Sequence, residues 1–157
     1  MPVEAYLLRY AFPCTFVIKM RDRVDDATFR MLEKNAIEGK PVDRHVLESV
    51  YKKAFGRMKQ VAKDMSKTSY WDNEVIREYF VNRHNSMIAD DLEYEAAPES
   101  IRELCKTVTA AVVEVRDGFL IVKYGAGKTR VVGSVFVPDA RIGDSVIVHY
   151  GYAIERA

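Results

Sequence analysis

Two residues in the C-terminal third of the chain, Cys105 and His149, are of types that can bind a metal together. A cysteine thiolate is a soft ligand that suits low-valent iron, and a neutral imidazole is the commonest nitrogen ligand for transition metals. The two residues are far apart in the sequence, so only the fold could bring them together. Each also has a plain structural interpretation: His149 as a packed or hydrogen-bonded strand residue, and Cys105 as a buried thiol that closes a short helix.

The segment that would position these residues has the pattern of short strands separated by turns. Pro98 favours the first turn of a short helix that ends at Leu104, and apolar, β-branched stretches follow it. Tight turns are expected at Asp117-Gly118 and at 125–128. Strands are predicted at 108–115, 119–124, 130–137 and 146–154. Four or five short strands of this kind suit a small closed barrel of the OB-like type.

One glycine-rich stretch, Gly125-Ala126-Gly127-Lys128-Thr129, superficially looks like the end of a phosphate-binding loop. The motif requires an earlier glycine that is not at the right spacing here, and it should lead from a strand into a helix. Residues 130–137 are strand-like instead. The stretch is therefore predicted to be a hairpin turn.

Both ends of this C-terminal segment resemble the hydrogenase-maturation chaperone family HypC/HupF. Residues 104–115 read Leu-Cys-Lys-Thr-Val-Thr-Ala-Ala-Val-Val-Glu-Val, where members of the family typically have Met-Cys-Leu-Ala-Ile-Pro-Gly-Lys-Val-Val-Glu-Ile. Residues 143–154 read Gly-Asp-Ser-Val-Ile-Val-His-Tyr-Gly-Tyr-Ala-Ile, where the family closes with Gly-Asp-Tyr-Val-Leu-Val-His-x-Gly-Phe-Ala-Ile. The resemblance covers residues 105–157, and no family suggests itself for residues 1–103.

The resemblance implies a fold and a function. The fold is a small OB-like barrel. The function is that of an accessory protein in nickel-iron hydrogenase assembly, which carries an iron atom bearing cyanide and carbon monoxide. The implied partners are a HypD-like maturation protein and the hydrogenase large subunit. Cys105 would be the iron ligand and His149 its helper, and Arg102 and Lys106 could attract the anionic iron-cyanide group.

Residues 1–88 are expected to form a helical domain whose role the sequence does not indicate. Apolar residues at spacings of three and four predict a helix over 43–66 and a further helix over 71–87 that Asp72 or Asn73 could cap. A shorter helix should begin at Asp25 or Asp26 and end at Ile37, while 15–20 could be either strand or helix. With a linker and short helix over 89–104 and the barrel over 105–157, the predicted fold class is α+β.

Two other functions remain open from the sequence. The first is a protein-interaction module that keeps the barrel without the metal role; its anchor residues, if exposed, would be Tyr70, Trp71, Tyr79 and Phe80. The second and weaker one is binding of single-stranded nucleic acid on the barrel, through Phe119, Tyr124, Tyr150 and Tyr152 beside Lys123, Lys128 and Arg130. No flanking sequence resembles a nucleophile elbow or an oxyanion loop, so we predict that the protein is not an enzyme.

The amino-acid composition gives no support for nucleic acid or a membrane as the binding partner. The 157 residues are 48% hydrophobic and 30% charged, and their formal net charge of +1 gives no overall field for nucleic acid or an acidic membrane. No apolar run has the length of a membrane span and no secretory signal is apparent, so a cytoplasmic location is expected. Cys14 and Cys105 are expected to be reduced, with Cys14 in the core, and His45 and His84 are expected to be solvated.

Overall fold

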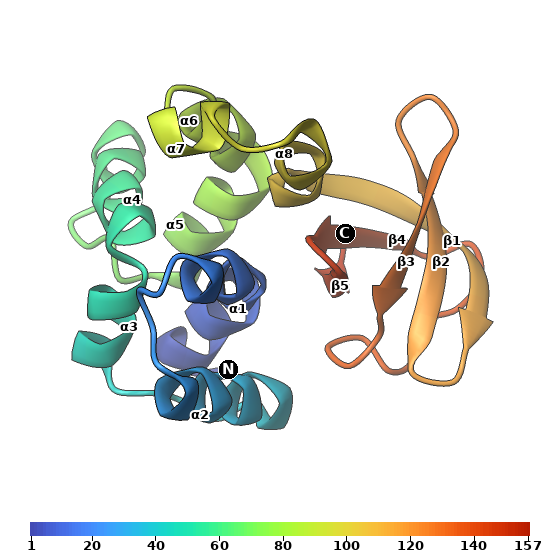
Figure 1. The fold of residues 1–157 in the computed structure, drawn as a ribbon, viewed down its shortest axis with the longest axis horizontal. Coiled ribbons are helices and arrows are strands. Elements are labelled where there is room, and N and C mark those ends of the chain that lie inside the picture. The colour runs from blue at the N-terminus through green and yellow to red at the C-terminus, as the bar shows by residue number, and fades with distance from the viewer. The chain divides into compact units, whose positions relative to one another are not determined.

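The computed structural model describes the whole chain, Met1–Ala157, and divides it into two compact units, Met1–Met87 and Ile88–Ala157. The first unit is helical, and the second contains all the strands (Figure 1). The first unit contains α1 (Val3–Met20), α2 (Asp26–Glu38), α3 (Arg44–Val50), α4 (Lys52–Asp64), α5 (Asn73–Arg77), the π-helix η1 (Glu78–Arg83) and most of α6 (His84–Ala89).

Aspartate side chains begin three of these helices. The carboxylates of Asp25, Asp43 and Asp72 accept hydrogen bonds from backbone N–H groups in the first turns of α2, α3 and α5, which have no acceptor within the helix. Helix α2 ends at Gly39, whose φ of 65° is left-handed and suits glycine. The predicted helix from Asp25 or Asp26 is confirmed, and so is the cap at Asp72.

Residues 43–66 do not form the single helix that their apolar spacing predicts. Helix α3 ends at Val50 and α4 begins at Lys52, because Tyr51 between them has the non-helical angles φ −104° and ψ 40°. The ring of Tyr51 is buried, and its hydroxyl forms a hydrogen bond of 2.6 Å with Thr15 Oγ1 on α1. This buried anchor accounts for the break, which leaves the apolar spacing on either side intact.

The helix predicted over 71–87 begins later and is irregular. Trp71 precedes the Asp72 cap, and the π-helix η1 separates α5 from α6. In a π-helix each backbone N–H group bonds to the carbonyl five residues earlier, so the side chains that follow are rotated relative to an α-helix. The segment 15–20, left open between strand and helix, lies in α1.

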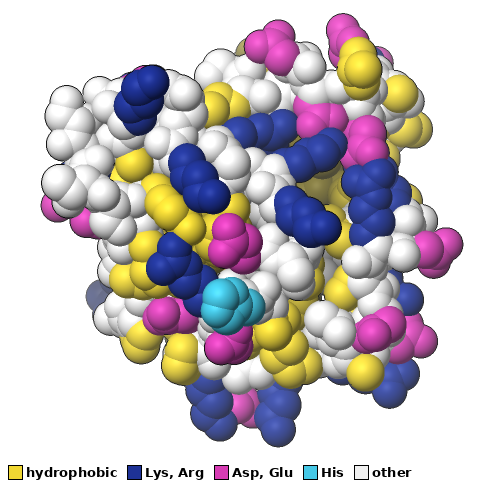
Figure 2. All heavy atoms as spheres, turned by 90° about the vertical axis from the view of Figure 1, so that its left-hand side faces the viewer, with side chains coloured by type: hydrophobic (Ala, Val, Ile, Leu, Met, Phe, Trp, Pro, Cys, Tyr) yellow, Lys and Arg dark blue, Asp and Glu magenta, His cyan; other side chains and the backbone are white.

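Aromatic rings fill the core of the helical unit. Tyr10 of α1 stacks on Phe80 at 5.2 Å between ring centroids, and Phe16 contacts Phe29 of α2 at 5.3 Å. Of the four proposed anchor residues, Tyr79 and Phe80 are buried core, while Tyr70 and Trp71 are half-buried. The side of the molecule where α3 and α4 lie shows basic side chains mixed with acidic and hydrophobic ones (Figure 2), in keeping with the small net charge.

The second unit begins with the short helices α7 (Leu92–Glu95) and α8 (Glu99–Cys105), and five strands follow. The strands are β1 (Thr107–Arg116), β2 (Phe119–Tyr124), β3 (Lys128–Gly133), β4 (Ser145–His149) and β5 (Tyr152–Arg156). They close into a barrel in the order β1-β2-β3-β5-β4, and β1 pairs antiparallel with both β2 and β4. The α+β fold class with a small C-terminal barrel is confirmed.

Small apolar residues from every strand fill the barrel. Ala110, Val122, Val132, Val148 and Ala153 are members of this core, one from each strand in turn. Strands β3 and β5 touch at one parallel pair, Gly133 with Tyr152. A Cβ atom at Gly133 would lie 3.3 Å from the Tyr152 ring, so the glycine permits this close approach.

The predicted strand 146–154 is two strands, β4 and β5, joined by a tight turn at Tyr150 and Gly151. Tyr150 has a φ of 55°, which is uncommon for a residue with a side chain. The turn predicted at 125–128 is confirmed over 125–127, since β3 begins at Lys128 and no helix follows.

None of the helices combines the length and apolar composition needed to cross a membrane.

Candidate functional site

Cys105 is the last residue of α8, two positions before β1 begins. Strand β1 pairs with β4 in a register that sets Thr107 opposite His149. The chain around Cys105 and the chain around His149 therefore lie at the same end of the barrel. The sequence could not prove this closeness, because it depends on the closure of the barrel between β1 and β4.

The thiol of Cys105 is half-buried and points at the turn that follows His149. Its Sγ atom donates a hydrogen bond to the hydroxyl oxygen of Tyr150 at 3.8 Å. The backbone N–H group of Tyr150 donates to the carbonyl oxygen of Leu104 at 3.1 Å. The end of α8 and the β4–β5 turn are thus joined through both backbone and side chain.

His149 is fully buried at the end of β4, and its backbone is paired on both sides. Thr107 is its partner on β1, and Tyr152 is its partner on β5. The side chain that meets the Cys105 thiol in the structure is Tyr150, the neighbour of His149 in the chain. The roles of Cys105 and His149 as metal ligands stay predictions.

Arg130 of β3 holds this end of the barrel together. One guanidinium nitrogen donates to the carbonyl oxygen of Tyr150 at 3.2 Å, and another to that of Glu103 at 3.4 Å. The second nitrogen also donates to the Tyr124 hydroxyl at 3.0 Å, and the guanidinium lies 4.8 Å from the centre of that ring. The planar guanidinium suits this shared role, because it offers several donors in a fixed arrangement.

A carboxylate on α8 adds an electrostatic link to the barrel. Glu103 is 3.2 Å from Lys128 Nζ on β3 and 3.6 Å from Lys106 Nζ. The hydrogen bond from Lys128, supported by its charge and that of Lys106, holds the pKa of Glu103 below its ordinary value of 4.5. Two of the three cations considered for nucleic acid binding, Lys128 and Arg130, are therefore engaged in contacts within the barrel unit.

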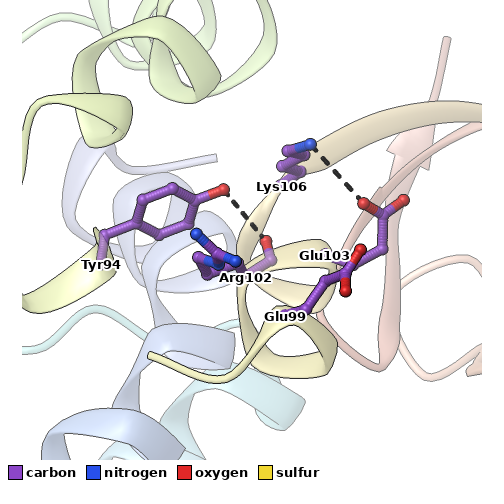
Figure 3. A pocket seen from close by; sticks show the side chains of 5 residues that line it. All are labelled: Tyr94, Glu99, Arg102, Glu103 and Lys106. Carbon is purple, nitrogen blue, oxygen red and sulfur yellow. Dashed lines mark hydrogen bonds and ion pairs between the residues drawn. The ribbon is translucent and has the colours of Figure 1, made fainter. Parts of the chain in front are cut away.

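A pocket of about 200 Å³ lies beside α8 (Figure 3). The hydroxyl of Tyr94 on α7 donates to the carbonyl oxygen of Arg102 at 3.3 Å and so ties the two short helices together. The other lining side chains, from α8 and the residue that follows it, are two cations and two carboxylates: Glu99, Arg102, Glu103 and Lys106. Cys105 does not line this pocket, although Arg102 precedes it by one helical turn. The pocket provides charged groups near the thiol without enclosing it.

Sequence reasoning missed the roles of Tyr150 and Arg130 at this site. The sequence suggests both residues only for contact with nucleic acid, and no local pattern marks either one as a neighbour of Cys105.

The expectation that the side chain of His84 is solvated is wrong, since it is 4% exposed, while His45 is exposed as predicted. Cys14 is half-buried rather than fully in the core, and both cysteines are thiols.

The barrel and the short helix that leads into it, with Cys105 as the last residue of that helix, define a small β-barrel domain with a thiol at one end. Residues 104–157 match the model of the HupF/HypC family, so the resemblance seen in the sequence is confirmed for this segment, about a third of the chain. The chain has no match among curated proteins. The family domain supports a role in hydrogenase maturation in general, and with it interaction with other hydrogenase maturation proteins.

Proposed function

We propose that the barrel unit carries the iron-cyanide-carbonyl group of nickel-iron hydrogenase during its assembly. The observation behind this proposal is the family match over residues 104–157, which starts one residue before Cys105 and includes His149. In the HypC/HupF family the matching cysteine is thought to hold the iron group in complex with HypD. The cargo then passes to the hydrogenase large subunit.

In this proposal Cys105 supplies the thiolate that binds the iron. The thiol is half-buried, so it is partly open to solvent, and it donates a weak hydrogen bond to the Tyr150 hydroxyl, which could also donate to a thiolate. Arg102 and Lys106 stand on either side of it in the sequence and would attract a cargo that bears anionic cyanide. His149 would assist as an imidazole at the same end of the barrel.

The contacts of Arg130 and Tyr150 would position the thiol. Arg130 bonds to the carbonyl oxygens of both Glu103 and Tyr150, so the segments that lead into Cys105 and out of His149 are held at a fixed separation. A ligand on a fixed segment loses little conformational entropy when it binds its cargo. The site therefore needs the closed barrel as well as the cysteine.

The test is anaerobic co-expression of the full chain with HypD, purification through the chain, and measurement of iron per chain. Cys105→Ala should lose the iron, while Cys14→Ala, the matched control for loss of a thiol, should retain it. Equal iron in the wild type and in Cys105→Ala would contradict the proposal. Folding of each variant is checked by circular dichroism.

A second candidate is a docking module that binds a maturation partner without carrying iron. Cys105 ends α8, two residues before β1, and has chain on both sides, whereas the family's cysteine is typically the first residue of the mature protein. The family's Pro and Gly after the cysteine are Thr109 and Ala110 here, which pair regularly with Ile147 and Val146 of β4. If HypD is captured equally by the wild type and Cys105→Ala, and neither contains iron, the docking module is the correct interpretation.

A further inference from the structure

The helical unit contains a second pair of metal-ligating side chains, Cys14 and His84. Cys14 lies within α1 directly after Pro13, and His84 is the first residue of α6, directly after the π-helix η1. The Cys14 Sγ atom and a ring nitrogen of His84 lie within 4.8 Å of each other. Residues 70 positions apart in the chain are thus brought together inside one unit.

Two aromatic neighbours pack against the ring of His84. It stacks on Phe80 at 5.8 Å with an interplanar angle of 23°, and it meets Tyr79 edge-on at 5.7 Å. All three residues belong to η1 or follow it, so the π-helix sets which way the ring faces. π-Helical turns inside helices occur frequently at functional sites.

The hydrogen bond of His84 leaves one ring nitrogen with a lone pair that can bind a metal. Nδ1 lies 3.2 Å from the side-chain oxygen of Asn85, which can only accept, so Nδ1 carries the proton. In a neutral imidazole the lone pair is then on Nε2. Histidines that bind metals almost always donate their other N–H group to an oxygen in this way, which fixes the ring and raises the basicity of the ligand.

The residue after Cys14 is hydrogen-bonded to a buried tyrosine hydroxyl. This residue, Thr15, is itself buried, its partner is the Tyr51 hydroxyl, and burial raises the pKa of Tyr51 above its ordinary value, so this hydroxyl stays neutral. A thiolate at Cys14 would therefore not be repelled by a negative charge on Tyr51. A bound cation would supply the charge that stabilises the thiolate.

We infer that Cys14 and His84 form a binding site for a borderline-soft divalent metal ion such as zinc. Zinc binds thiolate sulfur at about 2.3 Å and imidazole nitrogen at about 2.0 Å, so donors this close need only small side-chain rotations to share an ion. Thiolate and imidazole are donor types that zinc binds together in mixed sites. The inference is independent of Cys105 and of the iron cargo.

Cobalt(II) titration of the metal-free full chain under anaerobic conditions tests the site, because cobalt bound to a thiolate has a charge-transfer absorption in the near ultraviolet. The wild type and the control Cys105→Ser should both develop this absorption. Cys14→Ser, which changes a single atom, should not develop it, and His84→Gln should bind cobalt at least tenfold more weakly. Zinc should displace the cobalt and abolish the absorption.

Three results would overturn the inference: no absorption in the wild type, an unchanged absorption in Cys14→Ser, or its loss in Cys105→Ser. His84 is buried, so the folding of His84→Gln is checked by circular dichroism. If that variant does not fold, the comparison between Cys14→Ser and Cys105→Ser decides the question alone. Failure of the iron-carrier proposal would instead be seen in the iron content of Cys105→Ala, so the two ideas fail separately.

Discussion

At the scale of single residues, the site depends on neighbours of Cys105 that have no metal-binding chemistry of their own. Tyr150 accepts a hydrogen bond from the thiol, and its backbone N–H group binds the last turn of α8. Arg130 reaches the carbonyl oxygens on both sides of this junction. Cys105 therefore comes from α8, and the residues that position it, Arg130 and Tyr150, come from β3 and the β4–β5 turn.

Replacing Arg130 tests this arrangement. Arg130→Met removes donors to two backbone carbonyls and to the Tyr124 hydroxyl, and should lower the free energy of unfolding by about 1 to 3 kcal/mol. Arg130→Lys should restore only part of the loss, because an ammonium group cannot reproduce the planar set of donors. Urea unfolding gives the values.

The control for Arg130 is Lys123→Met, which removes an exposed cation from the neighbouring strand β2 and should change stability by less than about 0.5 kcal/mol. If Arg130→Met were as stable as Lys123→Met, the guanidinium would not hold this end of the barrel together.

At the scale of elements, the attachment of α8 to the barrel should depend on pH through Glu103. Its folded-state pKa lies below the ordinary value of 4.5, so its stabilising contribution is present above pH 4.5 and is lost as pH falls through the folded-state pKa. The pair with Lys128 is partly exposed, so its contribution is at most about 1 kcal/mol. Glu103→Gln should lower Tm at pH 7 and have little effect at pH 3.

The comparison for Glu103 is Asp90→Asn, an exposed carboxylate of the same unit. It should change Tm little at either pH. A Tm difference between Glu103→Gln and the wild type that persisted undiminished at pH 3 would contradict the electrostatic explanation.

The barrel itself should be sensitive to the volume of its core. Leu120 of β2 is 1% exposed within the barrel core, so Leu120→Ala should cost about 2 to 5 kcal/mol through lost burial and the cavity left behind. Val131 of β3 is 61% exposed, and Val131→Ala should cost less than about 0.5 kcal/mol. Similar losses in the two variants, measured by urea unfolding, would mean that the closed barrel core is wrong.

An element can be predicted from the sequence when its own residues determine where it begins and ends, and it cannot when a contact with a distant residue does. Helix α2 and the turn at 125–127 are specified by their own capping and glycine residues, and both are predictable. The break at Tyr51 depends on Thr15 of another helix, which no local pattern reveals. The turn at Tyr150 interrupts an apolar run at a residue that rarely adopts a positive φ, so the run predicts one strand where there are two.

The candidate site was predictable only in part for a similar reason. Cys105 and His149 could be found from their chemistry and from the motifs around them. Their common position at one end of the barrel follows from the β1–β4 register, which the sequence does not show. Arg130 reaches the site because β3 lies in the same barrel, and no motif near Cys105 or His149 indicates this. The burial of His84 follows from the packing of its ring on Phe80 after the π-helix, which the helical spacing does not show.

At the scale of the whole molecule, the chain combines a C-terminal segment that matches the HupF/HypC family model with a helical unit that the match does not cover. The two units carry separate thiol sites in this account. Cys105 in the barrel unit would hold the iron cargo, and Cys14 in the helical unit would bind a divalent ion. Substitution of the cysteine in one unit therefore serves as the control for substitution of the cysteine in the other.

The most direct test of the central claim is the infrared spectrum of the full chain, purified anaerobically after co-expression with HypD. Iron-bound cyanide and carbon monoxide have stretching bands that protein groups do not obscure. We predict these bands in the wild type and in Cys14→Ala, and their absence in Cys105→Ala. A Cys105→Ala spectrum identical to that of the wild type, or a wild type without bands while HypD is bound, would contradict the claim that Cys105 of the barrel carries the iron group.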